Sequence, residues 1–219
     1  MGERGPKPKN KVKIKWSPDF AYAIGLLTTD GNLSPDGRHL DFTSNDIEQL
    51  NNFKKCLGID VKIGFKISGF TGKKSPRIQF GDISFYKFLI KIGFMPRKSK
   101  VISKLKIPRQ YFFDFLRGHF DGDGTFYSYW DERWKSSFMF YTVFMSASEL
   151  HIKWIDSQIY NLIKIRGRIT QNGNMYYLRY AKADSLKLLP KIYYSNNITY
   201  LSRKFEKIKK ALKINIDHK

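Results

Sequence analysis

Residues 23–31 read AIGLLTTDG, and residues 116–124 read LRGHFDGDG. In each stretch an apolar run ends in an acidic residue that a glycine follows, and Asp-Gly pairs are typical of tight turns. The two acidic residues, Asp30 and Asp123, lie 93 residues apart, and an earlier glycine in each stretch keeps the same interval. The matched spacing indicates that the chain contains an internal duplication.

The sequence around each stretch predicts the same order of helices and hairpins. Ser17 favours a helix start, because its hydroxyl can accept a backbone N–H of the first turn. In the first copy we expect helices over residues 17–30, 46–57 and 83–92, a hairpin over 33–44, and strands over 61–68 and 76–81. In the second copy we expect helices over residues 111–120, 149–163 and 184–193, with hairpins turning at 131–132 and 172–174, and a final basic helix over 200–213. Two details are specific: Asp184 is expected to cap its helix, and Ile47 is expected to face inward with Leu50, Phe53 and Leu57.

These elements predict the fold class and the domain boundaries. The order helix, hairpin, helix, hairpin, helix in both halves gives an α+β protein built from two αββαββα repeats. We expect a flexible basic arm at residues 1–15, a first repeat with its connector at 16–109 and a second repeat at 110–219. For the arm, contact with phosphates and simple solubilisation are both open.

The composition favours a nucleic-acid partner. The chain has 219 residues with 40 Lys plus Arg and 19 Asp plus Glu, so its formal net charge is +21. Such a field attracts polyanions, and a charge that serves only solubility is the alternative. The hydrophobic content of 42% is enough to form a core.

Cysteines, histidines and apolar segments exclude several other classes of protein. The single cysteine, Cys56, cannot form an internal disulfide or a CxxC zinc or iron–sulfur site, which favours a reducing, intracellular compartment, the cytoplasm or an organelle. Residues 1–16 lack an apolar secretory segment, and no stretch reaches the about 20 apolar residues that a membrane helix needs. The histidines are too scattered to predict a His-ligated metal site: His39, His119, His151 and His218.

The paired acidic residues carry the candidate chemistry. If the two helices pack through Gly25 and Gly118, Asp30 and Asp123 come together at one end of the interface. Two close carboxylates repel each other unless a cation neutralises them. Oxygen ligands favour a hard ion such as Mg²⁺. The alternative for either residue is a purely structural Asp-Gly turn, as at Asp36, to which we assign no chemistry.

The two stretches resemble the signature helices of LAGLIDADG homing endonucleases in their single-chain, two-repeat form. The second copy matches the motif at Gly118, Asp121, Gly122, Asp123 and Gly124. The first copy keeps Gly25, Asp30 and Gly31 and departs from the motif at Thr28 and Thr29. The resemblance covers about residues 17–214. It implies a pseudo-twofold protein whose signature helices form the interface, with Gly25 and Gly118 in contact, and whose antiparallel sheets form a saddle over DNA.

The resemblance also implies the metal ligands. Asp30 and Asp123 would bind the metal, each near one scissile phosphate, and the backbone carbonyls of Thr29 and Gly122 would contact it as well. Mg²⁺ is the expected ion. Mn²⁺ is expected to substitute for it, and Ca²⁺ is expected to support binding without cleavage.

Two lysines are candidates for stabilising the charge that develops on the phosphate during cleavage. Lys98 and Lys204 stand where the family keeps a basic residue beside its active site, one after the third helix of each repeat. The alternative is that Lys98 and Lys204 are ordinary lysines that contact DNA phosphates or solvent.

The expected strands carry the candidate DNA-reading residues. A two-stranded ribbon fits the major groove, where Arg and Gln side chains read base edges. In repeat 1 the candidates are Arg38, Asp41, Thr43, Lys62, Lys66, Arg77 and Gln79. In repeat 2 they are Tyr127, Tyr129, Arg133, Lys135, Arg168, Thr170, Gln171, Tyr177 and Arg179. Because alternate strand residues point to opposite faces, about half of them are expected to face solvent or the core instead.

The leading functional prediction is a monomeric homing endonuclease that cuts both strands of one long, asymmetric DNA site and needs no protein partner. The asymmetry follows from two unequal repeats in one chain. An RNA maturase, or a non-cleaving nucleic-acid binder on the same fold, is the alternative. A ribosome-associated RNA-binding protein would explain the charge but not the paired acids. An intein is disfavoured, because the chain lacks the splicing residues at its ends.

Overall fold

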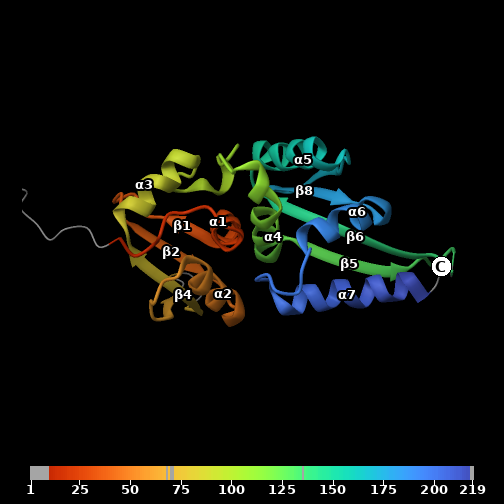
Figure 1. The fold of residues 1–219 in the computed structure, drawn as a ribbon, viewed down its shortest axis with the longest axis horizontal. Helices are drawn as coiled ribbons and strands as arrows, with labels where there is room; N and C mark the ends of the chain where they lie inside the picture. Colours follow the sequence, from red (N-terminus) through yellow and green to blue (C-terminus); the bar gives the residue numbers. More distant parts are fainter. Residues whose placement is uncertain (1–9, 68, 70–71, 135, 218–219) are drawn as a thin grey trace, which may run out of the picture.

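The computed structural model describes residues 10–67, 69, 72–134 and 136–217 and shows two similar halves side by side (Figure 1). The first half contains α1 (Pro18–Asp30), β1 (Gly31–Leu33), β2 (His39–Thr43), α2 (Ile47–Leu57), β3 (Gly64–Ile67), β4 (Lys74–Gly81) and α3 (Ile83–Ile92). The second half contains α4 (Phe112–Asp123), β5 (Thr125–Trp130), β6 (Phe138–Ser146), α5 (Glu149–Ile163), β7 (Arg168–Asn172), β8 (Met175–Tyr180), α6 (Lys182–Ile192) and α7 (Ser202–Asp217). Within these residues no helix has both the length and the apolar content to cross a membrane.

The two sheets have the same topology. Sheet 1 has the antiparallel strand order β1-β2-β4-β3, and sheet 2 has the order β5-β6-β8-β7. The first strand of each sheet also pairs at the same position. Asn32 of β1 pairs with Asp41 of β2, and Thr125 of β5, 93 residues after Asn32, pairs with Val143 of β6. The duplicated αββαββα architecture is therefore confirmed, with α7 following the second copy.

Side-chain caps fix where the helices of the first repeat begin. Ser17, Asp46 and Asp82 precede α1, α2 and α3, and each side chain accepts a hydrogen bond from a backbone N–H of the first turn. The expected cap of α6 is wrong, because α6 begins at Lys182 and Asp184 lies inside its first turn. At that place the Asp184 carboxylate still favours the helix, since it lies near the positive end of the helix dipole.

The two repeats meet where α1 packs against α4, at the centre of the molecule (Figure 1). A Cβ atom on Gly25 would overlap the backbone carbonyl of Phe115 and lie 2.9 Å from the Cα atom of Gly118. A Cβ atom on Gly118 would overlap the backbone carbonyl of Tyr22. The two glycines therefore allow the helix backbones to approach more closely than any side chain would permit.

Each sheet buries one face against helices of its own repeat. In sheet 1, Phe42 and Ile78 are buried and Phe42 stacks on Phe53 of α2, with ring centroids 4.4 Å apart. The expectation for Ile47 is wrong, since its side chain is 47% exposed. Ile47 is the first residue of α2, where the helix turn is open to solvent and borders a pocket. The other side of each sheet, here called its open face, carries the alternate residues, which include the partly exposed Asp41 of β2 and Tyr127 of β5.

Several element boundaries differ from the sequence prediction, and α7, for example, covers Ser202–Asp217 instead of 200–213. β3 begins at Gly64 instead of residue 61, because Val61 and Ile63 pack against the core without pairing to β4. β4 begins at Lys74, two residues before the expected start. α4 continues through Asp123, because the buried side chain of Asp121 is part of the packed helix end.

The segment before α1 is attached to the first repeat. The backbone N–H groups of Lys11 and Val12 donate hydrogen bonds to the Asp82 carboxylate at 2.7 and 2.9 Å. The Val12 side chain is buried. The inner end of the expected basic arm is thus packed against repeat 1, and residues 1–9 lie outside the described residues.

Candidate active site

Asp30 and Asp123 are the last residues of α1 and α4, so the packing of these two helices places both carboxylates at one end of the interface. Burial, and after it the charge of Asp123, raise the pKa of the Asp30 carboxyl to about 6. Burial also raises the pKa of Asp123, while Lys204 and Lys98 lower it. The two acidic residues therefore form an electrostatically coupled pair, partly shielded from water.

Lys98 lies beside the end of α1. Its Nζ atom donates hydrogen bonds to the backbone carbonyls of Thr29 and Gly31, at 3.3 and 2.6 Å, on either side of Asp30. The side chain is buried, and burial lowers the pKa of its ammonium group to about 8, against the attraction of Asp30 and Asp123. The group is thus mostly protonated at neutral pH, and Lys98 is a cation held inside the site.

Lys204 lies in the same way beside the end of α4. Its Nζ atom donates hydrogen bonds to the backbone carbonyls of Phe120, Gly122 and Gly124, at 2.6, 3.1 and 2.6 Å. Burial lowers the pKa of this ammonium group to about 8 as well. Lys98 contacts the carbonyls of Thr29 and Gly31. Lys204 contacts those of Gly122 and Gly124, which lie 93 residues later, so both lysines have the same geometry.

The site contains a polar side chain that the sequence analysis missed. Gln49 on α2 is 3% exposed, its Nε2 donates to Asp30 Oδ2 at 3.2 Å, and its Oε1 accepts the Ser44 hydroxyl at 2.6 Å. The available signal was a glutamine one helical turn before Phe53, on the buried side of the helix. For Asp123 in repeat 2, no hydrogen bond from a side chain is found among the described residues, so the two carboxylates are not held alike.

The side chain of Thr29 shapes the joint between the helix ends. Its hydroxyl donates to the Leu26 carbonyl at 2.8 Å and lies 3.2 Å from Asp30 Oδ2. A Cβ atom on Gly122 would overlap this hydroxyl. The Thr29 side chain on α1 therefore occupies the space that the absence of a side chain at Gly122 on α4 leaves open.

The donor set fits a hard divalent cation. No three His, Cys, Asp or Glu side chains converge on a metal-sized site within the described part of the chain. Mg²⁺ in nucleotide and nucleic-acid enzymes is held by one or two carboxylates, with phosphate oxygens and waters as the other ligands. Asp30 and Asp123 supply such a pair. The carbonyls of Thr29 and Gly122 each already accept one lysine hydrogen bond, which uses one of the two acceptor positions of each oxygen.

Two pockets open beside the carboxylates. One of about 600 Å³ is lined by Asp30 and Gln49, and one of about 450 Å³ is lined by Asp123 and Lys204. Arg203 lines both pockets. Space for a ligand therefore lies next to each acidic residue.

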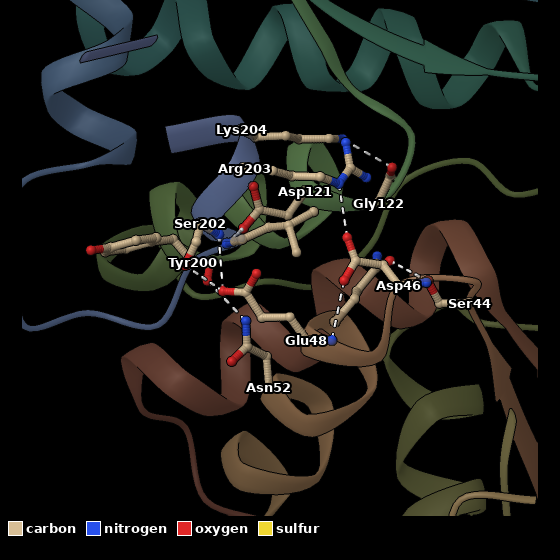
Figure 2. A network of polar contacts seen from close by, with 12 residues as sticks. Ser44, Asp46, Glu48, Asn52, Asp121, Gly122, Tyr200, Ser202, Arg203 and Lys204 are labelled. Carbon is tan, nitrogen blue, oxygen red and sulfur yellow. Dashed lines mark hydrogen bonds and ion pairs between the residues drawn. The ribbon is translucent and has the colours of Figure 1, made fainter. Parts of the chain in front are cut away.

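Arg203 belongs to a polar clasp that joins the start of α7, and Tyr200 just before it, to α2 and its cap in the other repeat (Figure 2). Arg203 Nε donates to Asp46 Oδ2 at 2.8 Å, and the Ser202 backbone N–H donates to Glu48 Oε1 at 3.0 Å. Asn52 Nδ2 donates to the backbone carbonyl of Tyr200 at 2.8 Å. Sequence analysis missed this clasp, because its partners are about 150 residues apart.

Asp121, the earlier acid of the second motif, has a structural role. It is fully buried and accepts hydrogen bonds from the Tyr22 hydroxyl at 2.8 Å, the Tyr193 hydroxyl at 3.0 Å and the Leu201 backbone N–H at 2.8 Å. These bonds attach α1 and the segment before α7 to the end of α4. Thr28, at the equivalent place in repeat 1, donates only to its own helix.

Most of the DNA-reading candidates share the open faces of the sheets. Directly paired residues of an antiparallel sheet lie on one face. The register places on the open face of sheet 1 the candidates Asp41, Thr43, Lys66, Arg77 and Gln79. It places on the open face of sheet 2 the candidates Tyr127, Tyr129, Arg168, Thr170, Tyr177 and Arg179.

The structure places the remaining candidates elsewhere. Gln171 pairs with Tyr176 on the opposite face from Thr170, because neighbouring strand residues alternate. Arg38 and Arg133 lie in exposed hairpin connections. Lys62 precedes β3 and is in no strand. Lys135 lies outside the described residues.

The fold also brings together two histidines that are far apart in the sequence. The His119 and His151 rings are buried and stack, with centroids 5.3 Å apart. His151 Nδ1 lies 2.8 Å from the Ser103 carbonyl, while His119 Nδ1 and His151 Nε2 have no hydrogen-bond partner within the described residues. The pair lies among aromatic rings and is separate from the two carboxylates.

Similarity to known proteins is seen at the level of structure. No protein-family model matches the sequence, and no curated protein matches it. The I-LtrWI LAGLIDADG homing endonuclease bound to target DNA is 10% identical, with 88% of each chain covered and a TM-score of 0.59. I-DmoI in complex with DNA and Mn is 14% identical, with 82% of this chain and 98% of that chain covered and a TM-score of 0.53, and I-DmoI has also been solved with DNA and Ca.

Full-length DUF199/WhiA from Thermatoga maritima has the same fold over most of this chain. It is 18% identical with a TM-score of 0.57, and the match covers 94% of this chain. The chain spans 64% of the length of that protein. At such identities the similarity establishes the architecture alone. The protein described here therefore has the two-repeat LAGLIDADG fold.

Proposed function

We propose that this protein is a site-specific homing endonuclease that hydrolyses both strands of a long, asymmetric double-stranded DNA site with a divalent metal ion. The observation that supports this best is the matched pair of sites at the ends of α1 and α4. Each contains a partly buried carboxylate and a lysine, buried in the case of Lys98 and half-buried in the case of Lys204, in the same geometry. Two equivalent sites suit the cutting of two strands, and a single chain that supplies both acts as a monomer.

The acidic residues and lysines have distinct roles in this proposal. Asp30 and Asp123 bind the ion, which when bound supplies Lewis-acid activation for phosphodiester hydrolysis. Lys98 and Lys204 hold the helix ends in place, and their positive charge lowers the repulsion between the carboxylates and an approaching phosphate. Gln49 restrains the Asp30 carboxylate through the hydrogen bond from its Nε2 atom. Mg²⁺ is the ion we expect, with Mn²⁺ as a substitute.

The open faces of the two sheets form the proposed DNA surface. They flank the helix pair on both sides, so a duplex laid across them would pass the two carboxylates (Figure 1). A net charge of +21 suits a surface that binds phosphates. The faces differ in composition, since sheet 1 has Asp41 and Gln79 at the register positions where sheet 2 has Val143, which is buried, and Arg179. Unequal faces support an asymmetric target.

The experiment that tests the proposal is a selection from a randomised duplex library, first for binding in Ca²⁺ and then for cleavage in Mg²⁺ or Mn²⁺. We expect one enriched sequence that is not a palindrome, cut on both strands only when Mg²⁺ or Mn²⁺ is present. A chelator provides the control without metal. If the protein enriches a duplex but cuts it in no metal, the non-cleaving binder takes the place of the endonuclease. If it binds folded RNA and enriches no duplex, the maturase alternative takes its place.

A further inference from the structure

Three tyrosines form a ladder on the open face of sheet 2. The ring of Tyr127 lies 5.1 Å from that of Tyr141 and 6.5 Å from that of Tyr129, centroid to centroid, and Tyr129 and Tyr141 lie 6.3 Å apart. The angles between their ring planes are only 10° to 21°. The tyrosines therefore pack ring against ring, while Tyr129 remains 44% exposed.

Arg179 is held against this ladder. Its guanidinium carbon lies 5.9 Å from the centroid of the Tyr127 ring and 5.8 Å from that of the Tyr141 ring. Its Nε atom is buried and has no hydrogen-bond partner within the described residues. Contact with two rings restricts the side chain through cation–π attraction and leaves its two terminal nitrogens as the groups able to reach a ligand.

The guanidinium of Arg179 lacks the carboxylate that a half-buried arginine usually has. The fully buried Arg117 pairs with Asp114 at 2.9 Å, and Arg166 pairs with Asp156 at 3.0 Å. Within the described residues, the side chain of Arg179 makes no hydrogen bond or ion pair. Only the Nε atom of Arg179 is buried without a partner, so its two terminal nitrogens remain able to donate to a ligand that displaces water.

The position of Arg179 in the sheet favours contact with base edges over contact with phosphates. β8 is an inner strand between β6 and β7, and Arg179 pairs with Val143 on one side and with Arg168 on the other. The major groove admits a two-stranded ribbon, and the two inner strands, β6 and β8, place Arg179 in the middle of the sheet face. The equivalent residue of sheet 1 is Gln79, because Asp41 pairs with Gln79 as Val143 pairs with Arg179.

We infer that Arg179 is a specificity-determining residue that reads one guanine in the half-site under repeat 2. The inference rests on the proposed function, since it assigns a base within the proposed target. Guanine presents two acceptors, O6 and N7, in the major groove, and the two terminal nitrogens of an arginine match them. Because Gln79 replaces the arginine in repeat 1, the symmetry-related position of the other half-site is not read as guanine by this contact.

The first test uses the unaltered protein and a duplex obtained by selection. Each guanine of the repeat 2 half-site is replaced in turn by 7-deazaguanine, which lacks the N7 acceptor, and by inosine, which keeps O6 and N7. At one position we expect 7-deazaguanine to weaken binding by about 5- to 150-fold. Inosine at that position should bind almost as well as guanine. If every guanine of this half-site tolerates 7-deazaguanine, the inference is wrong.

The second test identifies the residue responsible. Arg179→Lys keeps the charge and loses the fork of two donors, so the selection should lose its guanine at that one position, while the salt dependence of binding stays the same. Arg168→Lys, in the same row of the sheet, is the matched control and should keep the guanine. A thermal melt of both variants checks that the sheet is intact.

The outcomes separate the inference from the proposed function. If the unaltered protein selects and cuts a duplex site, and Arg179→Lys selects the same site with the same guanine preference, the inference fails and the proposed function stands. If the unaltered protein enriches no duplex site at all, both fail. If Arg168→Lys relaxes the same position as much as Arg179→Lys, the reading is not the work of Arg179, and the inference is overturned.

Discussion

Lys98 and Lys204 stand in the same relation to the two interface helices. Each ammonium group donates hydrogen bonds to the backbone carbonyls on both sides of the acidic residue that ends a helix. Lys98 does so around Asp30, and Lys204 does so around Asp123. Because these hydrogen bonds attach each lysine to a helix end, the acidic residue, the helix end and the cation form one structural unit in each repeat. Single substitutions can test each part.

Replacing Lys98 with methionine should lower the free energy of unfolding by about 2 kcal/mol, because two carbonyls at the end of α1 lose their donor. The measurement is the midpoint and slope of urea unfolding. Lys100→Met is the control, since Lys100 is an exposed lysine in the same short turn and should leave the midpoint unchanged. Equal midpoints for the two variants would show that the hydrogen bonds of Lys98 do not stabilise the fold.

Replacing Gly118 with alanine should destabilise the protein by about 3 kcal/mol, because the new methyl group would overlap the Tyr22 carbonyl and force α1 and α4 apart. Thermal unfolding measures the effect. Gly64→Ala is the control, as a Cβ atom there meets nothing within 4 Å. A Gly118→Ala protein that melts with the parent would contradict the close helix packing.

Replacing Arg117 with methionine should cost about 3–5 kcal/mol, because the buried Asp114 loses its ion-pair partner. Two backbone carbonyls in the segment before α7, those of Thr199 and Ile192, also lose a donor. Arg166→Met is the matched control. Arg166 is 59% exposed in its pair with Asp156, so its loss should cost about 1 kcal/mol or less. If urea unfolding gave the same loss of unfolding free energy for both variants, the buried Arg117 would contribute no more to stability than the exposed Arg166.

The stability of the protein should fall in acid because of His119 and His151. Burial lowers the pKa of His151 to about 4 and that of His119 well below its usual value, and the positive charges of Lys98 and Lys204 act in the same direction. The unfolded chain binds these protons at a pKa near 6.5. Between pH 6.5 and 4 the unfolded state therefore holds more protons, so stability is full above pH 6.5 and is lost as the pH falls.

For His151 alone, the expected loss between pH 7 and pH 4 is about 3 kcal/mol. Urea unfolding at a series of pH values measures it. His151→Phe keeps a ring in the aromatic cluster and removes the titrating group, so its stability should depend less on pH than that of the parent. Parallel pH profiles for the two proteins would contradict this account.

The sequence was sufficient to predict the repeat, because it rests on local signals. Ser17 caps a helix three residues from the N–H it accepts, and the hydrophobic alternation of β2 and β4 marks one face of sheet 1 for burial. The acids Asp30 and Asp123 were recognisable because each follows an apolar helix at the same interval. Misplaced boundaries occurred where packing overrides local preference, as at Asp184.

The contacts around the acidic residues could not be predicted, because they join residues far apart in the chain. The sequence placed Lys98 near the site but could not show that it donates to carbonyls about 70 residues earlier. Gln49 resembles any polar residue of an amphipathic helix until α2 is packed beside Asp30. Arg203 at the start of α7 and Asp46 at the cap of α2 are 157 residues apart, and only the contact of α7 with the other repeat brings them together (Figure 2).

The proposed roles of Asp30 and Asp123 in cutting DNA can be tested by measuring the cleavage of each strand of a selected duplex in Mg²⁺. Asp30→Asn and Asp123→Asn keep the size of the side chain and remove its charge, so each should bind the duplex in Ca²⁺ and lose double-strand cleavage in Mg²⁺. Asp36→Asn, in an exposed Asp-Gly turn away from the site, should cut like the parent. Rapid cutting of both strands by the doubly substituted Asp30→Asn, Asp123→Asn protein would contradict the account.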